Sequence, residues 1–186
     1  MRDFSRVTNF SGVWERSTQT FHDNRGYFLE TYRENLMPKD TPGMIQDNFS
    51  ESKQFVLRGI HFQVGQSQLV TVLKGAVIDL SIDLRPNSPS FLKVYKTELN
   101  QEKNNQLLLP AGFGHGYLVL SPEAILNYKS SKYYGESEQF TINILESPFI
   151  SLLPKVVYEI SERDSTAPNL SGLLEDTNFV DSLSHD

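Results

Sequence analysis

Residues 76–84 carry the pattern that most constrains the fold, a regular alternation of apolar and polar side chains. The apolar members are Ala76, Ile78, Leu80, Ile82 and Leu84. A period of two is typical of a β-strand with one buried face. Gly75 precedes the run, and Arg-Pro-Asn-Ser-Pro at 85–89 ends it with residues that favour turns.

Seven further short runs have a similar strand-like character and are separated by links rich in Asn, Gly, Pro and Ser. They are residues 55–62, 69–73, 91–99, 106–109, 116–120, 124–130 and 140–144. Weak helical character is confined to residues 35–37 and to stretches of the last thirty residues. Short strands without long amphipathic helices predict an all-β fold, either a β-sandwich or a small barrel.

The length of the chain predicts a single domain. A chain of 186 residues can build one domain with a full core but not two comfortable ones. Because no repeat or linker divides it, we expect one domain over residues 1–186, with its core at about 8–168. Residues 171–186 form a polar, acidic tail, and the sequence leaves open whether this tail packs loosely or is disordered.

Composition narrows the classes of function. Hydrophobic residues make up 38% and charged residues 22% of the chain, as in ordinary soluble proteins. No apolar run is long enough to cross a bilayer, no signal peptide is recognisable, and the lack of cysteine fits a cytoplasmic protein. The net charge of −6 argues against nucleic-acid binding, although a few focused arginines would suffice for an anionic small molecule.

Two of the four histidines lie in strand and turn segments. His22 and His185 sit in polar surroundings and are expected at the surface, which leaves His61 and His115 as candidates for chemistry. A lone strand histidine is more often a hydrogen-bonded structural residue than a catalytic one. His61 and Gln63 are two residues apart, however, so their side chains share one face of a strand.

Two other segments add to this polar face. The run Pro-Ala-Gly-Phe-Gly-His at 110–115 fits the Pro-x-Gly-x-x-His turn of cupin proteins, which places a histidine at the mouth of the fold. A strand that begins at residues 127–129 leads to the pair Tyr133 and Tyr134. Together with His61 these features predict a polar pocket lined from several strands.

The same residues predict that the pocket holds no metal. Many cupins bind a divalent metal through His-x-His and a following Glu, whereas this chain has His61-Phe62-Gln63 followed by Gln66 and Gln68. Imidazole and carboxylate groups normally hold such metals, and amides are poor substitutes. We therefore expect neither a metal nor a cofactor.

Over roughly residues 8–168 the sequence resembles the dTDP-4-dehydrorhamnose 3,5-epimerase family, which has a cupin or jelly-roll β-sandwich fold. The matching segments keep the order and spacing of the family. They are residues 23–30, 46–50, 56–63, 83–89, 110–116, 128–129 with 133–134, and 161–164.

The resemblance implies a catalytic set of His61, Asp164 and Tyr128. His61 would be the base that removes a proton beside the ketone of a nucleotide-linked 4-keto-6-deoxy sugar, and Asp164 would orient it and stabilise its imidazolium form. Tyr128 would be the acid that returns a proton to the opposite face of the enolate. Without the resemblance, Tyr128 would be interpreted as a core aromatic.

The resemblance also implies a set of substrate-binding residues. They are Arg25, Glu30, Gln46, Arg58, Gln68, His115, Tyr134 and Arg163. Arg25 and Arg58 would neutralise the pyrophosphate, Glu30 and Gln46 would bind the nucleotide end, and Tyr134 would stack on the base. Glu30 is interpreted equally well as an exposed strand carboxylate.

The sequence departs from the family at three places. Gln68 stands where the family has a lysine near the developing enolate oxygen, so the positive charge of that lysine is missing. The run 135–138 is one residue short, and Ile-Leu-Glu at 144–146 replaces the usual Trp-Asp-Asp. These changes leave the base, its partner and the acid in place.

We therefore expect an epimerase that inverts C3, C5 or both in a dTDP-linked 4-keto-6-deoxy sugar during deoxysugar (rhamnose) and polysaccharide biosynthesis. The resemblance implies a homodimer, with no nucleic-acid or membrane partner. Three alternatives stay open: an epimerase of one carbon acting on another nucleotide sugar, a metal-dependent cupin enzyme, and a sugar-nucleotide binder without turnover.

Overall fold

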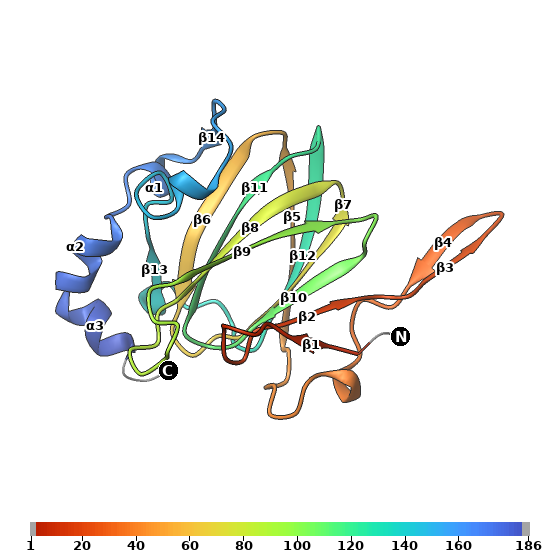
Figure 1. The fold of residues 1–186 in the computed structure, drawn as a ribbon, viewed down its shortest axis with the longest axis horizontal. Helices are drawn as coiled ribbons and strands as arrows, with labels where there is room; N and C mark the ends of the chain where they lie inside the picture. The colour runs from red at the N-terminus through yellow and green to blue at the C-terminus, as the bar shows by residue number, and fades with distance from the viewer. Residues whose placement is uncertain (1–2, 184–186) are drawn as a thin grey trace.

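Two β-sheets face each other in the structure, a computed structural model that describes residues 3–183 (Figure 1). The first, here called the β5 sheet, has the order β1 (Ser5–Arg6), β2 (Trp14–Ser17), β10 (Asn105–Leu109), β7 (Gln68–Lys74), β12 (Glu123–Ser130) and β5 (Gln46–Lys53). The second, the β6 sheet, has the order β13 (Gln139–Thr141), β6 (Val56–Gln63), β11 (Phe113–Val119), β8 (Ala76–Asp83) and β9 (Val94–Asn100). A short strand, β14 (Glu159–Ile160), pairs in parallel with β6.

The predicted all-β sandwich with few short helices is confirmed. Its helices are η1 (Glu34–Leu36), η2 (Glu136–Glu138), η3 (Ile150–Leu152), α1 (Glu162–Ser165), α2 (Leu170–Glu175) and α3 (Thr177–Leu183). Each strand expected from the alternation overlaps an observed one. Strand β5 was not predicted, because its residues are mostly polar and it lies at a sheet edge with alternate side chains exposed.

Strand β8 differs from the expectation of one buried face. Both of its faces are covered, since most residues on either face are buried. Its apolar face packs in a cluster with the C-terminal helices, and its other face is turned towards the β5 sheet. Asp79, Ser81 and Asp83 are consequently fully buried, so each needs a hydrogen-bond partner inside the protein.

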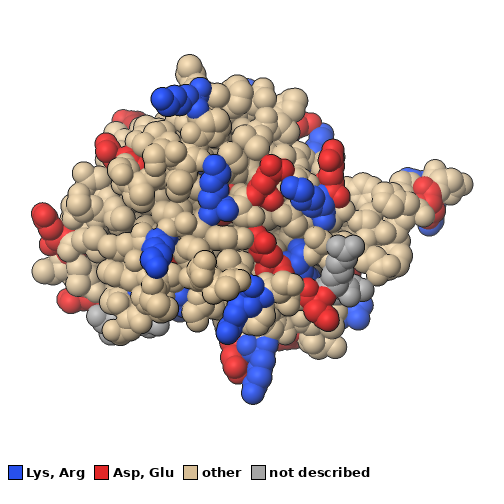
Figure 2. Space-filling view, in the orientation of Figure 1, with Lys and Arg blue, Asp and Glu red and all other residues tan. Residues whose placement is uncertain are grey.

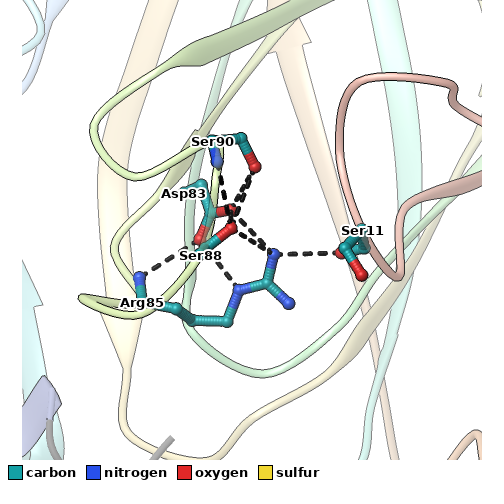
Figure 3. Close-up of polar contacts among 5 residues, drawn as sticks. All are labelled: Ser11, Asp83, Arg85, Ser88 and Ser90. Carbon is teal, nitrogen blue, oxygen red and sulfur yellow. Dashed lines mark hydrogen bonds and ion pairs between the residues drawn. The ribbon is translucent and has the colours of Figure 1, made fainter.

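Asp83 shows how such a buried carboxylate is satisfied (Figure 3). Its Oδ1 accepts from the backbone N–H and Nε of Arg85 at 3.1 and 2.8 Å. Its Oδ2 accepts from Arg85 Nη2 at 2.7 Å, Ser88 Oγ at 2.5 Å and Ser90 Oγ at 2.6 Å. Arg85 Nη2 also donates to the Ser11 carbonyl at 3.0 Å. This cluster ties the end of β8 to the following loop and to the N-terminal segment.

The apolar core has two layers. One lies between the two sheets, and the other lies between the β6 sheet and helices α2 and α3, which cover that sheet in Figure 1. Phe179 of α3 is fully buried, with its ring edge-on to Phe62 and Phe140 at centroid distances of 6.0 and 5.1 Å. The described part of the tail, residues 171–183, is therefore packed against the sandwich rather than loose.

A two-stranded hairpin, β3 (Thr20–Asp23) and β4 (Gly26–Leu29), projects away from the sandwich (Figure 1). Its aromatic side chains are open to solvent, Phe21 at 54% and Phe28 at 68% exposure. His22 is exposed on this hairpin, as expected. His185, the other histidine expected at the surface, lies outside the described residues.

Basic and acidic side chains mingle on the face shown in Figure 2, without a continuous basic area there. The surface charge on that side thus gives no sign of a phosphate-backbone track. None of the helices in the described part of the chain is long and apolar enough to cross a membrane.

Candidate active site

A cavity of about 380 Å³ opens between the sheets, and polar side chains from both sheets line it. The β5 sheet contributes Gln46, Asn48, Ser50, Gln68, Tyr128 and Ser130. The β6 sheet contributes Arg58, His61, Gln63, His115, Tyr117 and Gln139. Tyr134, Gln66 and Arg163 complete the wall from loops and from α1. Eight of the eleven residues predicted for the site lie on this wall.

His61 is hydrogen-bonded to Asp164, the predicted partner of the base. The His61 Nε2 and Asp164 Oδ1 atoms are 2.8 Å apart. Asp164 is only 4% exposed, whereas 37% of the His61 side chain is accessible. The carboxylate is thus hidden behind the imidazole, and the imidazole faces the cavity.

Strand β14 brings these two residues together although they are 103 positions apart. Its pairing with β6 aligns Ile160 with Leu57, so that α1 begins beside the middle of β6. Ser161 caps α1 by accepting a hydrogen bond from the Asp164 backbone N–H at 3.1 Å. The Asp164 side chain then accepts a second bond, from the Gly59 backbone N–H to Oδ2 at 3.1 Å.

The protonation of Asp164 determines the tautomer of His61. Burial disfavours the carboxylate, but the hydrogen bonds from His61 and from the Gly59 N–H outweigh it and hold the Asp164 pKa below its usual value. A carboxylate can only accept hydrogen bonds, so Nε2 of His61 must carry the proton. The lone pair on Nδ1 is left as the basic site of the ring.

Tyr128 lines the opposite wall of the cavity. It belongs to β12 in the β5 sheet, whereas His61 belongs to β6 in the other sheet. Burial, together with the neighbouring Tyr117, raises the Tyr128 pKa, and the nearby Arg58 offsets part of that rise. The phenol is therefore protonated at neutral pH and can act as a proton donor.

His115 forms a second histidine–carboxylate pair beside His61. The two histidines are direct cross-strand neighbours of β11 and β6. His115 Nε2 lies 2.5 Å from Asp79 Oδ2, and Ser81 Oγ donates to Asp79 Oδ1 at 2.9 Å. The buried polar residues of β8 thus support the histidine of the 110–115 turn.

The charges on the cavity wall suit an anionic ligand. Arg58 and Arg163 are the charged side chains that line it, and no Asp or Glu is among the lining residues in the part of the chain that the structure describes. Arg163 Nη2 donates to Gln139 Oε1 at 2.6 Å, and Arg58 Nε donates to Ser52 Oγ at 3.1 Å. Two arginines at one pocket can bind a diphosphate despite the net negative charge of the chain.

Besides Asp164, which lies behind His61, two predicted site residues are absent from the wall of this cavity. Arg25 is at the tip of the β3–β4 hairpin, 85% exposed and paired with Asp23 at 2.6 Å. Glu30 follows the hairpin and is paired with Arg33 at 2.5 Å. A single chain therefore does not bring either side chain to His61.

Three glutamines hold the loop that carries Tyr133 and Tyr134. Gln66 Nε2 donates to the Lys132 carbonyl at 3.3 Å, and Gln63 Nε2 donates to the Tyr133 carbonyl at 2.8 Å. Gln46 Oε1 accepts from the Tyr134 N–H at 2.8 Å. Side-chain amides thus fix the backbone of this wall and leave both tyrosine rings exposed.

Some residues that line the cavity were not predicted from the sequence. They are Asn48, Ser50, Gln66, Tyr117, Ser130 and Gln139. A signal existed for the first two, because Gln46, Asn48 and Ser50 alternate along β5 and must share a face. The same rule, applied to the already predicted pair His61 and Gln63, places both on the wall.

If the site were chosen by cavity volume alone, a different cavity would be chosen. A larger cavity of about 790 Å³ lies beside the N-terminal segment, lined by residues such as Phe10, Pro89 and Pro148. Its charged lining residues are Arg6 and Lys93, and among residues 3–183 no histidine or carboxylate lines it. The smaller cavity holds the histidine pairs and the tyrosines, so the chemistry belongs there. Across residues 3–183, no three His, Asp or Glu side chains group closely enough to hold a metal ion.

Comparison with known proteins identifies the family of the chain. The family model described as dTDP-4-dehydrorhamnose 3,5-epimerase matches residues 7–172. The chain is 38% identical over 161 residues to the dTDP-4-dehydrorhamnose 3,5-epimerase of Sinorhizobium fredii, with 82% of each chain covered.

Solved structures show the same architecture. NovW, a 4-keto-6-deoxy sugar epimerase from the novobiocin biosynthetic gene cluster of Streptomyces spheroides, has a TM-score of 0.86 at 31% identity, covering 94% of this chain and 91% of NovW. The dTDP-6-deoxy-D-glucose-3,5-epimerase of Legionella pneumophila, in complex with dTDP-4-keto-L-rhamnose, has a TM-score of 0.83 at 32% identity, covering 92% of this chain and 94% of that one. The predicted cupin-type fold and epimerase activity are confirmed. The chain belongs to the dTDP-4-dehydrorhamnose 3,5-epimerase family of sugar-nucleotide epimerases.

Proposed function

We propose that the enzyme inverts C3, C5 or both in a dTDP-linked 4-keto-6-deoxy sugar, with His61 as the base and Tyr128 as the acid. One observation carries the proposal: His61, which is hydrogen-bonded to Asp164 behind it, and Tyr128 line one cavity from opposite sheets. Inversion needs a proton to leave one face of a carbon and return to the other. A base and an acid on facing walls meet that requirement.

The reaction begins at a carbon next to the ketone, whose C–H is acidic because its carbanion is an enolate. His61 Nδ1 takes this proton and the ring becomes an imidazolium, which the Asp164 carboxylate stabilises. The Tyr128 hydroxyl then donates a proton to the other face of the carbon, and the C–H bond forms again with inverted configuration.

Binding in the proposed complex divides between the two ends of the substrate. Arg58 and Arg163 neutralise the diphosphate, and His115 contacts the sugar. Gln46 and Tyr134 bind the nucleotide end, where the exposed Tyr134 ring stacks on the base. The Legionella pneumophila relative binds a dTDP-linked keto sugar, which supports this class of substrate.

Arg25 and Glu30 enter this scheme through a second copy of the chain. We propose a homodimer in which the β3–β4 hairpin of one protomer reaches the cavity of its partner. The exposed Phe21 and Phe28 of the hairpin support this arrangement, because exposed apolar side chains gathered on one projecting element mark a surface that a partner covers. Within each protomer, residues 1–186 act as one domain. Cytoplasmic localisation stays a prediction from composition.

Mixing two damaged variants tests the shared site. His61→Ala lacks the base and Arg25→Ala lacks the hairpin arginine, so each homodimer should be impaired. A mixed dimer contains one site with an intact His61 and the partner's intact Arg25. Unfolding and refolding the two variants together should therefore restore activity. No gain in the mixture would show that Arg25 does not act across a dimer.

Hydrogen exchange tests the chemistry and separates the alternatives. The enzyme is incubated in deuterated water with dTDP-, GDP- or CDP-linked 4-keto-6-deoxy sugar, and deuterium is located by NMR. Label at C3 and C5 indicates a double epimerase, and label at one carbon indicates a single one. Absence of label with every substrate would indicate a binder. Stoichiometric iron, manganese or zinc in the purified enzyme, required for exchange, would support a metal-dependent cupin enzyme instead.

A further inference from the structure

Two glutamine amides form a relay on the cavity wall that ends in an unused oxygen. Gln68 Nε2 donates to Gln66 Oε1 at 2.7 Å, and Gln66 Nε2 donates to the Lys132 backbone carbonyl at 3.3 Å. Gln66 is 9% exposed, and both glutamines line the cavity. Gln68 Oε1 is shielded from solvent and meets no hydrogen-bond donor among the residues that the structure describes.

The backbone carbonyl of Lys132 sets the direction of the relay. A carbonyl oxygen accepts hydrogen bonds and cannot donate them, so Gln66 must turn its nitrogen towards Lys132 and its oxygen towards Gln68. Gln68 in turn must present its nitrogen to Gln66. Reversing both amides would place the Gln66 oxygen against the Lys132 oxygen, which is repulsive. The unpaired Oε1 of Gln68 is thus held in place as an acceptor.

The position of Gln68 puts this acceptor next to the acid. Gln68 pairs with Ser130 of β12, and Val70, two residues along β7, pairs with Tyr128. Gln68 and Tyr128 therefore occupy adjacent rows on the same face of the β5 sheet, roughly 7 Å apart along the strands. A ligand group near Gln68 belongs to the part of the substrate that Tyr128 reaches, which is the sugar ring.

We propose that Gln68 is a specificity-determining residue that selects a sugar with a hydrogen-bond donor, a hydroxyl or an amino group, facing Oε1. Gln66 is the positioning residue that keeps this oxygen in place. A buried carbonyl without a partner is unfavourable, so a donor on the ligand gains a hydrogen bond and removes that cost together. A deoxy analogue lacks the donor, so it neither forms this hydrogen bond nor removes the cost of the unpaired carbonyl. This inference rests on the proposed function, because it assumes that the cavity holds a sugar nucleotide.

The test compares substrates that differ by one hydroxyl. The probes are dTDP-4-keto-6-deoxyglucose and its 2-deoxy and 3-deoxy analogues, and the readout is kcat/KM for deuterium exchange. The parent enzyme should prefer the fully hydroxylated substrate over one of the analogues by at least about 10-fold, the ratio that one hydrogen bond of about 1.4 kcal/mol gives. Gln68→Met, which keeps the length but has no acceptor of this kind, should reduce that ratio to near one.

Two further variants separate positioning from general damage. Gln66→Met leaves Gln68 present but unheld, so it should also lower the substrate ratio, and circular dichroism checks that the fold is kept. Gln54→Met is the matched control, because Gln54 likewise donates from Nε2 to a backbone carbonyl, that of Leu120 at 2.8 Å, but lies outside the cavity. Its substrate ratio should equal that of the parent.

The outcomes distinguish this inference from the proposed function. Dissociation constants of the same three ligands are measured by calorimetry with the parent and with Gln68→Met. A difference between ligands that depends on Gln68, without any exchange, would support the acceptor and overturn the epimerase mechanism. Exchange with equal ratios in the parent and in Gln68→Met would support the mechanism and overturn the acceptor. Neither exchange nor a Gln68-dependent difference would overturn both.

Discussion

At the scale of single residues, the site depends on how neighbours fix the protonation of two groups. The Asp164 carboxylate leaves His61 with a free Nδ1 lone pair, and burial keeps the Tyr128 phenol protonated. Neither group would be specified in this way on an isolated strand. The opposite roles of the two side chains therefore come from their surroundings on the two sheets.

Replacing Asp164 with Asn should disable the base while preserving the fold. The amide can present its NH2 group to His61, which favours the tautomer with the lone pair on Nε2 rather than on Nδ1. Exchange should fall by about 10²–10³-fold, as expected when general-base catalysis is lost. Deuterium incorporation by NMR measures this, and circular dichroism checks the fold. Exchange within a few-fold of the parental rate would show that Asp164 does not orient the base.

Replacing Tyr128 with Phe should separate the two proton transfers. The ring still fills its place, but the acid is missing, so inverted product should fall by about 10²-fold or more while label still enters from solvent on the side of His61. In the parent, the raised pKa of Tyr128 means that loss of this proton limits inversion only above about pH 10, the usual value for tyrosine. Equal losses of exchange and inversion in Tyr128→Phe would contradict the assignment of the acid.

At the scale of elements, Gly59 allows strands β6 and β11 to approach each other closely. Its φ of +102° is in the region that favours glycine. A Cβ there would lie 2.7 Å from both the Gly116 Cα and the His115 carbonyl oxygen. The same residue donates its N–H to Asp164. The close approach of these strands thus fixes the positions of His61, His115 and Asp164 together.

Gly59→Ala should therefore lower both stability and activity. The strained φ and the clash with backbone atoms should cost about 1–3 kcal/mol, which corresponds to a fall in Tm of roughly 2–4 °C per kcal/mol in a chain of this size. Gly43→Ala is the control, because its Cβ would meet only a Glu34 side-chain oxygen at 3.6 Å. A Gly59→Ala variant as stable as Gly43→Ala would refute the close packing.

The strands that carry the site residues were predictable from sequence, but the strands and sheet against which they pack were not. His61 and Gln63 share a face because side chains alternate along a strand, and that rule holds without knowledge of the partners. The polar face of β8 was assigned to solvent, because alternation alone cannot show that a second sheet covers it. Asp164 was identified only through the family resemblance, since its meeting with His61 depends on the pairing of β14 with β6.

The C-terminal tail and the β3–β4 hairpin show the same limit of prediction from sequence, because the role of each depends on what it packs against. Leu170, Leu173 and Phe179 gave no clear helical period, yet their burial in one core cluster with Phe62 orders the tail. Packing supplies stability that local propensity does not. Arg25 and Glu30 matched family positions, but the hairpin carries them away from the cavity of their own chain. Whether Arg25 and Glu30 reach a cavity therefore depends on how two copies of the chain pair.

At the scale of the whole molecule, buried carboxylates should make the free energy of unfolding fall at low pH. Burial disfavours the charged form of Asp83, but hydrogen bonds from Arg85, Ser88 and Ser90 outweigh it and hold its pKa below the usual value, as happens for Asp164. An aspartate in the unfolded chain titrates near pH ~3.9. The stabilisation is therefore complete above about pH 5 and is lost as the pH falls through the lowered folded-state pKa values.

Denaturant midpoints at pH 7, 5, 4 and 3 check this dependence. Asp83→Asn should be less stable than the parent at pH 7 and should lose less of its remaining stability between pH 5 and pH 3. Asp40→Asn, at an exposed position, should keep the parental dependence. If the Asp83→Asn profile ran parallel to that of the parent, the Asp83 cluster would not be a source of the acid sensitivity.

The most direct test of the mechanism is deuterium exchange into the dTDP-linked 4-keto-6-deoxy sugar by His61→Ala and His61→Asn. Both variants should fold with parental circular dichroism spectra and should incorporate no deuterium beyond the uncatalysed rate at C3 or C5, because Nδ1 of His61 is the group that removes the proton. Exchange at the parental rate by a correctly folded His61→Ala variant would show that another group is the base.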